Sequence, residues 1–545
     1  MTRMIGSLAD RYARWGRSDP GNGLEPRAAN YLTSTLGPPS PAPAIPLPEV
    51  QLTPSRLDAA GLAALEEAVG ASHVHTDRES RLAHAGGLSY LDLLARRGQA
   101  HPASPDVVVS PGSHADVVAL LVAAERCGLA VVPFGGGTSV VGGVQPEPGA
   151  HAGVVAVSFD RMADLIDVDA VSGTARVQPG MTGPVLERLL ATRGLTWGHV
   201  PQSWERATIG GYAATRSAGQ SSTGYGRSDA TVEALVVATP RGTLNLGRAP
   251  SSAAGPDLRA LFLGSEGTLG IITEVTLRVR RLPTTRWFEA VMLPDLDAGI
   301  TAFRELAQAR ACPDVMRLSD VAETRATMQM SGPTGRTADA MNAYLRARRV
   351  TDGAMAIVGW DGTSTKQVRA RRSLAFDILR RHGGASLGRG AGNSWVKHRF
   401  QGPYLRDTLM DQGYLVETLE TATSWTELAG LRASVVDVLT EALGSSYVMA
   451  HVSHVYETGA SLYITALASA GPEQAQRWRA AKRAATEVIV SRGATLTHHH
   501  GVGADHAPWL EHEVGALGVD LLRTIKSRLD PQGILNPGVL LPAQG

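Results

Sequence analysis

A regular pattern of apolar and polar segments begins near residue 106. Residues 106–110 (DVVVS) form an apolar run that predicts a buried strand. Ser113 and Asp116 have the spacing of a helix-capping box, and the apolar positions after them repeat with helical periodicity: Val117, Val118, Leu120, Leu121 and Ala124. Gly128 is expected to end this helix before a second strand at 129–134 (LAVVPF). A strand–helix–strand unit that runs into glycines is a candidate phosphate-binding site.

The region before this unit has a different composition. Residues 19–56 are rich in proline and glycine and culminate in GPPSPAPAIPLPEV. Proline lacks a backbone donor, so this stretch is not expected to hold a regular helix. We therefore predict that residues 1–56 form an N-terminal arm outside the core.

The glycines follow the second strand directly, in PFGGGTSVVGG (133–143). Glycine has no Cβ, so successive backbone N–H groups can turn toward one pyrophosphate, with Thr138 and Ser139 adding hydroxyl donors. A turn rich in bulges would have the same composition. The spacing is not that of a P-loop, and no helical pattern starts directly after it, which also disfavours a Rossmann motif.

Two further loops are rich in small residues. One spans 201–219 (PQSWERATIGGYAATRSAG), and the other opens 264–279 (GSEGTLGIITEVTLRV), in which IITEVTLRV alternates like a strand with one solvated face. Three such loops within about 150 residues are typical of one long ligand, because an extended dinucleotide contacts many loops at once.

Four phrases together resemble the FAD-linked oxidase superfamily typified by vanillyl-alcohol oxidase: PFGGGTS, TIGGYAATRSAG, GSEGTLGIITEVTL and LDPQGILNPGVL. The resemblance implies an α+β fold with a two-subdomain FAD-binding domain (57–285), an α+β cap domain over the flavin (286–490) and a C-terminal segment (491–545) that returns to the FAD domain and completes the active site. It implies FAD contacts from Pro133, Phe134, Gly135, Gly136, Gly137, Thr138, Ser139, Gln202, Ser203, Thr208, Gly210, Gly211, Thr215, Arg216, Ser217, Ala218, Glu266, Gly267, Thr268, Leu269, Gly270, Ile271 and Ile272.

Some relatives attach FAD covalently through a His or Cys close to the glycine loop. Residues 130–145 contain neither. We therefore predict non-covalent FAD.

Residues of the cap determine which reaction takes place over the flavin. One possibility is that they hold a metal ion. Flavin-dependent 2-hydroxy acid dehydrogenases that hold zinc or a similar metal carry a His, a second His about seven residues on, and a Glu in an E-H-G triplet, a suitable ligand set. Here the segments read AHVSHVYETGASLYITAL (450–467) and HHHG (498–501). His451 remains, but Tyr463 replaces the second His and His499 replaces the Glu. A phenol is a poor metal ligand, so no metal is expected. His454 and His451 could form a different site.

The same substitutions resemble the alkyldihydroxyacetonephosphate synthase family, also called alkylglycerone-phosphate synthases. Tyr463, HHHGVG (498–503), VMRLSD (315–320), PYLRD (403–407) and VETLETATSW (416–425) carry this resemblance, which extends over residues 57–541. It implies that an acyl-dihydroxyacetone phosphate exchanges its fatty acid for a fatty alcohol through an adduct at flavin N5, without net oxidation.

The resemblance also implies residue roles. Tyr463 would remove a proton from the carbon beside the ketone, and Arg406 would bind the anionic head group through its guanidinium fork. Arg317 would order the flavin and the active-site loops. The histidines His498, His499 and His500 would move protons, because imidazole titrates nearest neutrality.

Each of these residues also has an ordinary structural interpretation. A Tyr in SLYITAL is commonly a cross-strand core residue, and Arg406 beside Asp407 is commonly one half of a surface ion pair. A histidine run can bind metal, but on an extended chain only His498 and His500 would share a side. The alternative function is an FAD-dependent oxidase or dehydrogenase of a 2-hydroxy acid or another alcohol.

Charge and composition limit the partners. Lys and Arg total 52 against 51 Asp and Glu, a formal net charge of +1, and no long run of one sign is present, so nucleic acid is not an expected partner. The only cysteines, Cys127 and Cys312, are far apart, which indicates a reducing compartment. With no signal-like N-terminus and a composition rich in Ala, Gly and Arg, we expect a bacterial, cytoplasmic enzyme. A homodimer and a peripheral membrane contact are both compatible with this sequence.

Overall fold

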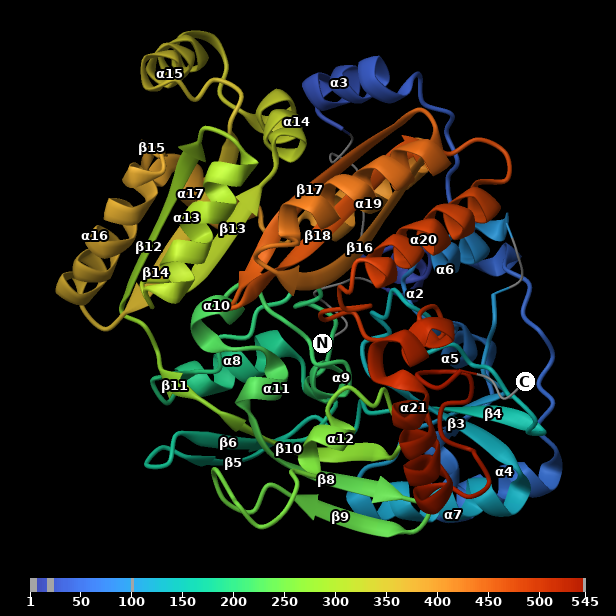
Figure 1. Ribbon diagram of the computed structural model, residues 1–545. Coiled ribbons are helices and arrows are strands. Elements are labelled where there is room, and N and C mark those ends of the chain that lie inside the picture. The colour runs from blue at the N-terminus through green and yellow to red at the C-terminus, as the bar shows by residue number, and fades with distance from the viewer. Residues whose placement is uncertain (1–6, 17–23, 100–101, 543–545) are drawn as a thin grey trace.

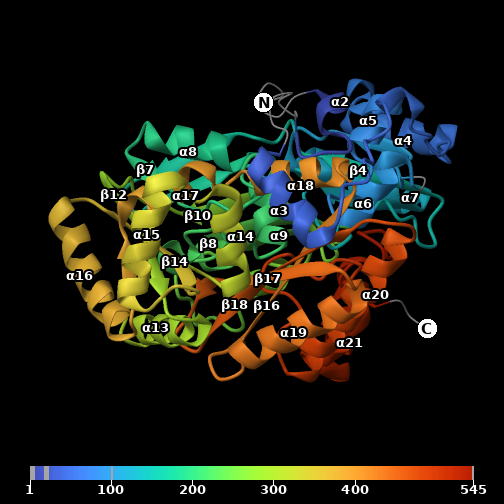
Figure 2. The same cartoon turned by 90° about the horizontal axis from the view of Figure 1, so that it is seen from above.

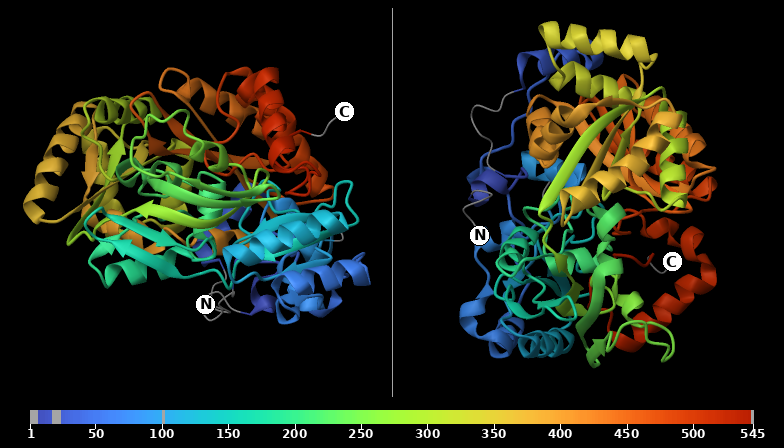
Figure 3. Two further views of the ribbon diagram at one scale, coloured as in Figure 1. Left: turned by 90° about the horizontal axis from the view of Figure 1, so that it is seen from below. Right: turned by 90° about the vertical axis from the view of Figure 1, so that its left-hand side faces the viewer.

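The computed structural model of the protein describes residues 7–16, 24–99 and 102–542. Two small sheets lie below a larger cap sheet, and the C-terminal helix α21 (Leu510–Leu529) lies beside the two small sheets (Figures 1 and 3). The molecule therefore has the predicted α+β organisation of two small subdomains and a cap.

The first sheet contains the predicted strand–helix–strand unit. Its strand order is β1 (Val74–His75), β2 (Val107–Val109), β4 (Gly153–Ser158) and β3 (Leu129–Phe134), with β2 and β3 parallel to β4. Helices α4 (Ala59–Val69) and α7 (His114–Cys127) share its apolar core. The side chain of Ser113 accepts a hydrogen bond from the backbone N–H of Asp116, and Gly128 ends α7 in the left-handed conformation with φ 62°. The two predicted strands, the helix, its N-cap Ser113 and its end are confirmed. The reciprocal half of the capping box is not formed, because the side chain of Asp116 accepts the backbone N–H of Gly112 at 2.8 Å instead of that of Ser113.

The second sheet is antiparallel. Its order is β5 (Leu165–Asp169), β6 (Thr174–Val177), β10 (Ile271–Arg278), β8 (Val232–Thr239) and β9 (Gly242–Leu246). The strand predicted in IITEVTLRV is β10, in which Val275 and Leu277 are buried whereas Arg278 is exposed. The first predicted cofactor loop follows β3, and the third precedes β10. The second, residues 201–219, lies between β7 (Leu195–Thr196) and β8 and contains α9 (Ile209–Ala214).

The cap sheet has seven strands. Their order is β15 (Ala385–Leu387), β12 (Thr285–Leu293), β14 (Ala354–Gly362), β13 (Val315–Ser319), β17 (Ser446–Val455), β18 (Gly459–Ser469) and β16 (Tyr414–Ser424). One face packs in a common core with α13 (Leu296–Gln308), α16 (Thr365–Arg381), α19 (Leu428–Leu443) and α20 (Gln474–Ser491). Figure 2 shows α13 and α19 on one side of β17 and β18, and α3 (Pro26–Leu36) and α18 (Gly402–Asp411) on the other.

Strand alternation separates the two faces of the cap sheet. In β18, Leu462, Ile464 and Ala466 belong to the helix-covered core, whereas Tyr463 and Thr465 line a cavity on the opposite side. The site described below is built on this second face.

The N-terminal arm differs from its prediction. Residues 26–36 form the helix α3, whose Pro26 occupies the first turn, where its missing N–H has no intrahelical partner to lose. Leu32 and Leu36 are buried against Tyr414 and neighbouring residues of the cap. The prediction of an arm outside the core is therefore wrong for α3, while residues 37–46 hold no regular helix and 47–49 form a short 3₁₀ turn.

The C-terminal segment returns to the first sheet. The backbone N–H of Val131 in β3 donates to the carbonyl of Ile534 at 2.7 Å, and the N–H of Asn536 donates to the carbonyl of Val131 at 2.9 Å. Residues 534–536 thus extend the edge of the first sheet. Among the residues described, no helix is both long and apolar enough to cross a bilayer.

Candidate active site

A cavity of about 1580 Å³ lies between the loops of the small sheets and the cap sheet. Small-molecule sites commonly measure about 300–1,000 Å³, so this one has room for a cofactor and a second molecule. All three predicted cofactor loops reach it. The predicted contacts that line it are Pro133, Gly135, Gly136, Gly137, Thr138, Ser139, Gln202, Ser203, Thr208, Gly210, Gly211, Thr215, Ser217, Ala218, Glu266, Gly267, Gly270, Ile271 and Ile272.

The glycines of the first loop permit close packing between two cofactor loops. A Cβ on Gly135 would meet Oγ1 of Thr208 at 2.4 Å, and a Cβ on Gly136 would meet the carbonyl oxygen of Arg206 at 2.0 Å. Gly137 has φ +61°, a conformation that L side chains rarely adopt. A larger residue would therefore force apart the two loops that form this wall of the cavity.

Three predicted cofactor contacts lie behind the loops instead of lining the cavity. Phe134 is buried, and its ring fills the space that a Cβ on Gly137 would occupy. Leu269 belongs to the core of the second sheet. Thr268 is buried, and its hydroxyl donates to the carbonyl of Val539 at 3.4 Å. These residues support the cofactor loops from within the fold.

Two more predicted residues also point away from the cavity. Arg216 is half-exposed, and its Nε donates to Asp229 at 3.0 Å. His498 is buried, and its Nε2 pairs with the hydroxyl of Tyr456 at 2.6 Å. Neither side chain lines the cavity, although both neighbour residues that do.

Glu266 joins the third cofactor loop to the C-terminal segment. Its carboxylate accepts the backbone N–H groups of Val502 and Gly503 at 2.9 Å. Burial raises the pKa of Glu266 to about 7, although these two hydrogen bonds act in the opposite direction. Nδ2 of Asn536 donates to the carbonyls of Glu266 and Gly143 at 2.6 and 3.0 Å. The histidine-containing loop is therefore anchored directly to the cofactor loops.

Tyr463 lies on the cavity face of the cap sheet, in the strand next to the edge strand β16. It lies in register between Glu420 of β16 and His451 of β17. Its hydroxyl donates to Oγ1 of Thr418 at 3.0 Å, and its ring stacks on that of His451 with centroids 4.9 Å apart. Burial raises the pKa of Tyr463 to about 12, so the phenol is protonated at neutral pH. It is therefore a cavity residue and not the core residue of its ordinary interpretation.

Glu420 holds the histidine loop in place. Its buried carboxylate accepts the backbone N–H groups of His498, His499 and His500 at 2.7, 3.1 and 3.0 Å and the hydroxyl of Thr497 at 2.5 Å. Burial alone would raise the pKa of Glu420, but the adjacent imidazoles, His499 first, hold it well below its usual range. The loop is thus folded around one ionised carboxylate.

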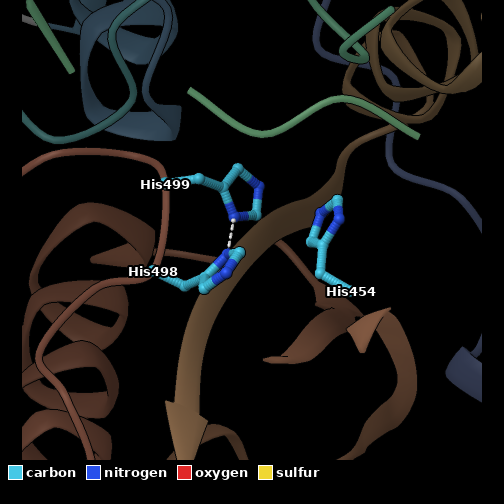
Figure 4. A group of neighbouring side chains, drawn as sticks. All are labelled: His454, His498 and His499. Atoms are coloured by element: carbon cyan, nitrogen blue, oxygen red, sulfur yellow. Dashed lines mark hydrogen bonds between the residues drawn. The ribbon is translucent and has the colours of Figure 1, made fainter. Parts of the chain in front are cut away.

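The three histidines are not on an extended chain. Nδ1 of His498 and Nδ1 of His499 lie 2.9 Å apart, and both rings face His454 of β17 (Figure 4). The expectation that His498 and His500 would share a side is wrong, because the shared carboxylate bends the backbone here. His499 and His500 line the cavity. Burial lowers the pKa of His500 to about 3, so its ring is neutral at neutral pH.

Arg317 fixes His451 against Tyr463. Its guanidinium lies 3.0 Å from both ring nitrogens of His451 and donates to Glu323 at 2.7 Å. Glu323 also lies 3.1 Å from Nδ1 of His451. Burial and the neighbouring Arg317 lower the pKa of His451. This leaves no role for His451 in a pair with His454, which lies next to other histidines.

Arg406 also lines the cavity. Its Nη1 donates to the carbonyl of Leu88 at 2.9 Å, and its buried Nε has no hydrogen-bond partner among the described residues. The carboxylate of Asp407 accepts the backbone N–H of Trp15 at 2.6 Å instead of pairing with this guanidinium. The surface ion pair of the ordinary interpretation is therefore not formed.

Comparison with known proteins identifies this arrangement. Residues 105–246 match the family described as FAD binding domain, and residues 282–540 match the C-terminal domain of FAD linked oxidases. The chain is 31% identical over 492 residues to the alkyldihydroxyacetonephosphate synthase of Trypanosoma brucei brucei, covering 88% of this chain and 80% of that one. It is 32% identical over 479 residues to the synthase of Dictyostelium discoideum, covering 86% and 78%. The chain belongs to the alkyldihydroxyacetonephosphate synthase family.

A solved alkyldihydroxyacetonephosphate synthase structure superposes with a TM-score of 0.81 at 26% identity, covering 97% of this chain and 99% of the other. The predicted family, fold and enzyme class are therefore confirmed, and FAD is the cofactor of this enzyme. Its cavity suits that cofactor, because the glycine loops supply backbone N–H groups at one end and the cap supplies ionisable side chains opposite.

Sequence reasoning missed several residues of this alkyldihydroxyacetonephosphate synthase family site. Glu420 and Thr418 lie two residues apart in VETLETATSW, so strand alternation could have placed both on the face of Tyr463. Glu323 could have been sought from its position one turn after Asp320, which caps α14 (Val321–Ser331). No local signal marks Tyr456 or Asn536, whose partners are 42 and at least 270 residues away.

Proposed function

We propose that the enzyme replaces the acyl group of an acyl-dihydroxyacetone phosphate with a fatty alcohol and so forms an ether bond without net oxidation. The observation that carries this proposal is the convergence of Tyr463, the histidine loop and Arg406 on the cavity lined by the FAD loops. Membership of the alkyldihydroxyacetonephosphate synthase family supports the same substrate class.

Arg406 is suited to the anionic head group. Its Nη1 donates a hydrogen bond to the carbonyl of Leu88, whereas its buried Nε has no hydrogen-bond partner among the described residues. A buried unpaired donor on a permanent cation favours an anionic ligand such as phosphate, which can accept two parallel hydrogen bonds.

The apolar part of the cavity is suited to the fatty chains. The cap and α3 contribute side chains without charge to this part: Leu32, Met328, Met330, Met341, Leu405, Leu409, Met449 and Leu467. Flexible Met side chains adapt to chains of different shape. The apolar wall therefore supports a lipid substrate with its head group toward Arg406.

Tyr463 and the neighbouring imidazoles would move the proton next to the ketone. The phenol is protonated at rest, so it exchanges a proton through a neighbour that can accept one. The rings of His500 and His499 lie 5.8 and 6.2 Å from the ring of Tyr463. Burial lowers the pKa of His500 to about 3 and makes it a weak acceptor, so we assign this role to His499. Arg317 acts through His451 and holds the stacked phenol in place, which makes it a positioning residue.

FAD, when bound, supplies an electrophilic ring system that can take up and return the substrate's electron pair. The loops around Gly136 and Gly211 would hold its pyrophosphate and ring. We propose that this association is non-covalent, so precipitation of the protein with acid should release all flavin into the supernatant. Flavin retained in the pellet would contradict it.

Anaerobic turnover tests the proposed function. The yellow enzyme is mixed with palmitoyl-dihydroxyacetone phosphate and hexadecanol, and the products are separated by mass spectrometry. We expect an alkyl ether and free palmitate, with flavin absorbance near 450 nm retained and no electron acceptor required. Bleaching of the flavin by a D-2-hydroxy acid, with no ether formed, would instead support the oxidoreductase alternative.

We further propose a cytoplasmic enzyme of bacterial origin, as the sequence indicates. A homodimer and a peripheral membrane contact also remain predictions. Sedimentation velocity and flotation with phosphatidylglycerol vesicles test the last two.

A further inference from the structure

His454 is an unusual buried residue in this site. It is 5% exposed, and its Nδ1 has no hydrogen-bond partner among the described residues. A buried polar atom without a partner is costly and calls for an explanation. A β-bulge between Val452 and Val455 explains its direction, because the extra residue turns His454 out of the face shared by Val448, Ala450 and Val452.

The ring of His454 lies next to two other imidazoles. It stacks on His498 at a centroid distance of 5.0 Å and meets His499 edge-on at 5.2 Å (Figure 4). One ring nitrogen from each of these residues lies within 4.8 Å of the other two. Nδ1 of His498 and Nδ1 of His499 are 2.9 Å apart and face each other.

Neighbouring residues fix the rings or the backbone of all three histidines. Nε2 of His498, the nitrogen that faces away from the cluster, pairs with the hydroxyl of Tyr456 at 2.6 Å. The backbone N–H of His454 donates to Ser461 at 3.1 Å, and Glu420 fixes the backbones of the other two. The Glu420 carboxylate also lies 3.3 Å from Nδ1 of His499, so negative charge stands next to the cluster.

We propose that His454, His498 and His499 form a binding site for one zinc ion, or a similar imidazole-preferring divalent ion, beside the flavin cavity. Three imidazoles suit Zn²⁺ and leave one position for water, whereas Mg²⁺ and Ca²⁺ prefer oxygen ligands. This set differs at two positions from that of the metal-dependent hydroxy acid dehydrogenases, because His454 and His498 stand in place of the residues at 451 and 463. The ion would occupy imidazole lone pairs that are needed to accept a proton during ether formation. Zinc would therefore inhibit ether formation, a consequence that rests on the proposed function.

Equilibrium dialysis of the FAD-loaded enzyme against Zn²⁺, after removal of metals by a chelator, tests the site. We expect close to one zinc per chain by elemental analysis, and no comparable uptake of Mg²⁺. His454→Gln should lose this zinc, whereas His512→Gln, which changes an exposed histidine of α21, should retain it. Tyr456→Phe leaves all three ligands in place and should weaken binding about tenfold.

Three results would overturn the site: no zinc bound by the wild-type enzyme, equal uptake by His454→Gln, or loss of zinc in His512→Gln. If His454→Gln does not retain FAD, Tyr456→Phe still tests the site. Unchanged zinc affinity in Tyr456→Phe would also contradict it. Zinc should lower the rate of ether formation in the wild type. The dialysis result does not depend on catalysis, so failure of the proposed function and failure of the zinc site are separately visible.

Discussion

Replacement of Glu420 by Gln tests how the histidine loop is held. One carboxylate oxygen accepts the hydroxyl of Thr497 and the N–H groups of residues 499 and 500, and the other accepts the N–H of His498. A Gln amide must direct its NH₂ group toward one of these donors. It therefore loses at least one charge-assisted hydrogen bond, which contributes about 1.5–3 kcal/mol, and weakens the others. We expect the free energy of unfolding to fall by about 3 kcal/mol.

Catalysis should fall as well, because the loop carries His499 and His500 into the cavity. A displacement of about 1 Å can reduce turnover about 100-fold. Urea unfolding followed by flavin fluorescence measures stability, and steady-state ether formation measures turnover. Glu441→Gln, an exposed position on α19, is the matched control and should change neither.

The stability difference between the wild type and Glu420→Gln should depend on pH in a definite direction. The pKa of Glu420 is lowered in the folded state, so its stabilising effect is complete above the pKa of about 4.3 of an unfolded Glu and disappears as the pH falls through the folded pKa. The stability difference between wild type and Glu420→Gln should therefore be full at pH 7 and shrink below about pH 4.3. Equal stability at pH 7, or a difference that grows in acid, would refute the reasoning.

Three further predictions concern the cavity. Tyr463→Phe keeps the ring stacked on His451 but removes the hydroxyl, so ether formation measured by mass spectrometry should fall about 10²–10⁴-fold with FAD content unchanged; normal turnover would exclude the phenol from the chemistry. Arg406→Lys retains the charge but loses the guanidinium fork, so KM for the acyl ketone phosphate should rise about tenfold with a smaller change in kcat, and an unchanged KM would place the head group elsewhere. Gly136→Ala should lower FAD affinity, measured by the ratio of flavin to protein absorbance, because its Cβ would meet a backbone oxygen at 2.0 Å; Gly390→Ala, with no atom within 4 Å, is the control and should retain FAD.

Local sequence was sufficient for the strand–helix–strand unit of the first sheet (β2, α7 and β3) and for placing the cofactor loops along the chain. Ser113 and Gly128 cap α7 through contacts within four residues, and the strands on each side follow from apolar runs. These interactions join residues that are close in the sequence, so rules based on apolar patterns and helix caps predict them. The combination of glycine loops also carried enough information to indicate the family and its cofactor.

Tertiary structure decided which of those loop residues face the ligand. Phe134 and Leu269 lie inside predicted loops, yet their apolar side chains pack into the fold. The helix α3 likewise depends on burial of Leu32 against the cap, which outweighs the proline-rich composition around it.

The histidine loop shows most clearly which features the sequence determines and which depend on the tertiary structure. The sequence by itself determined that three imidazoles and Tyr463 were available near a flavin. Only the fold brought Glu420 to the loop from about 80 residues away, and only a bulge in β17 turned His454 toward it. Such contacts depend on strand register and on the burial of a charged group, which are properties of packing between distant segments and leave no mark on the local pattern.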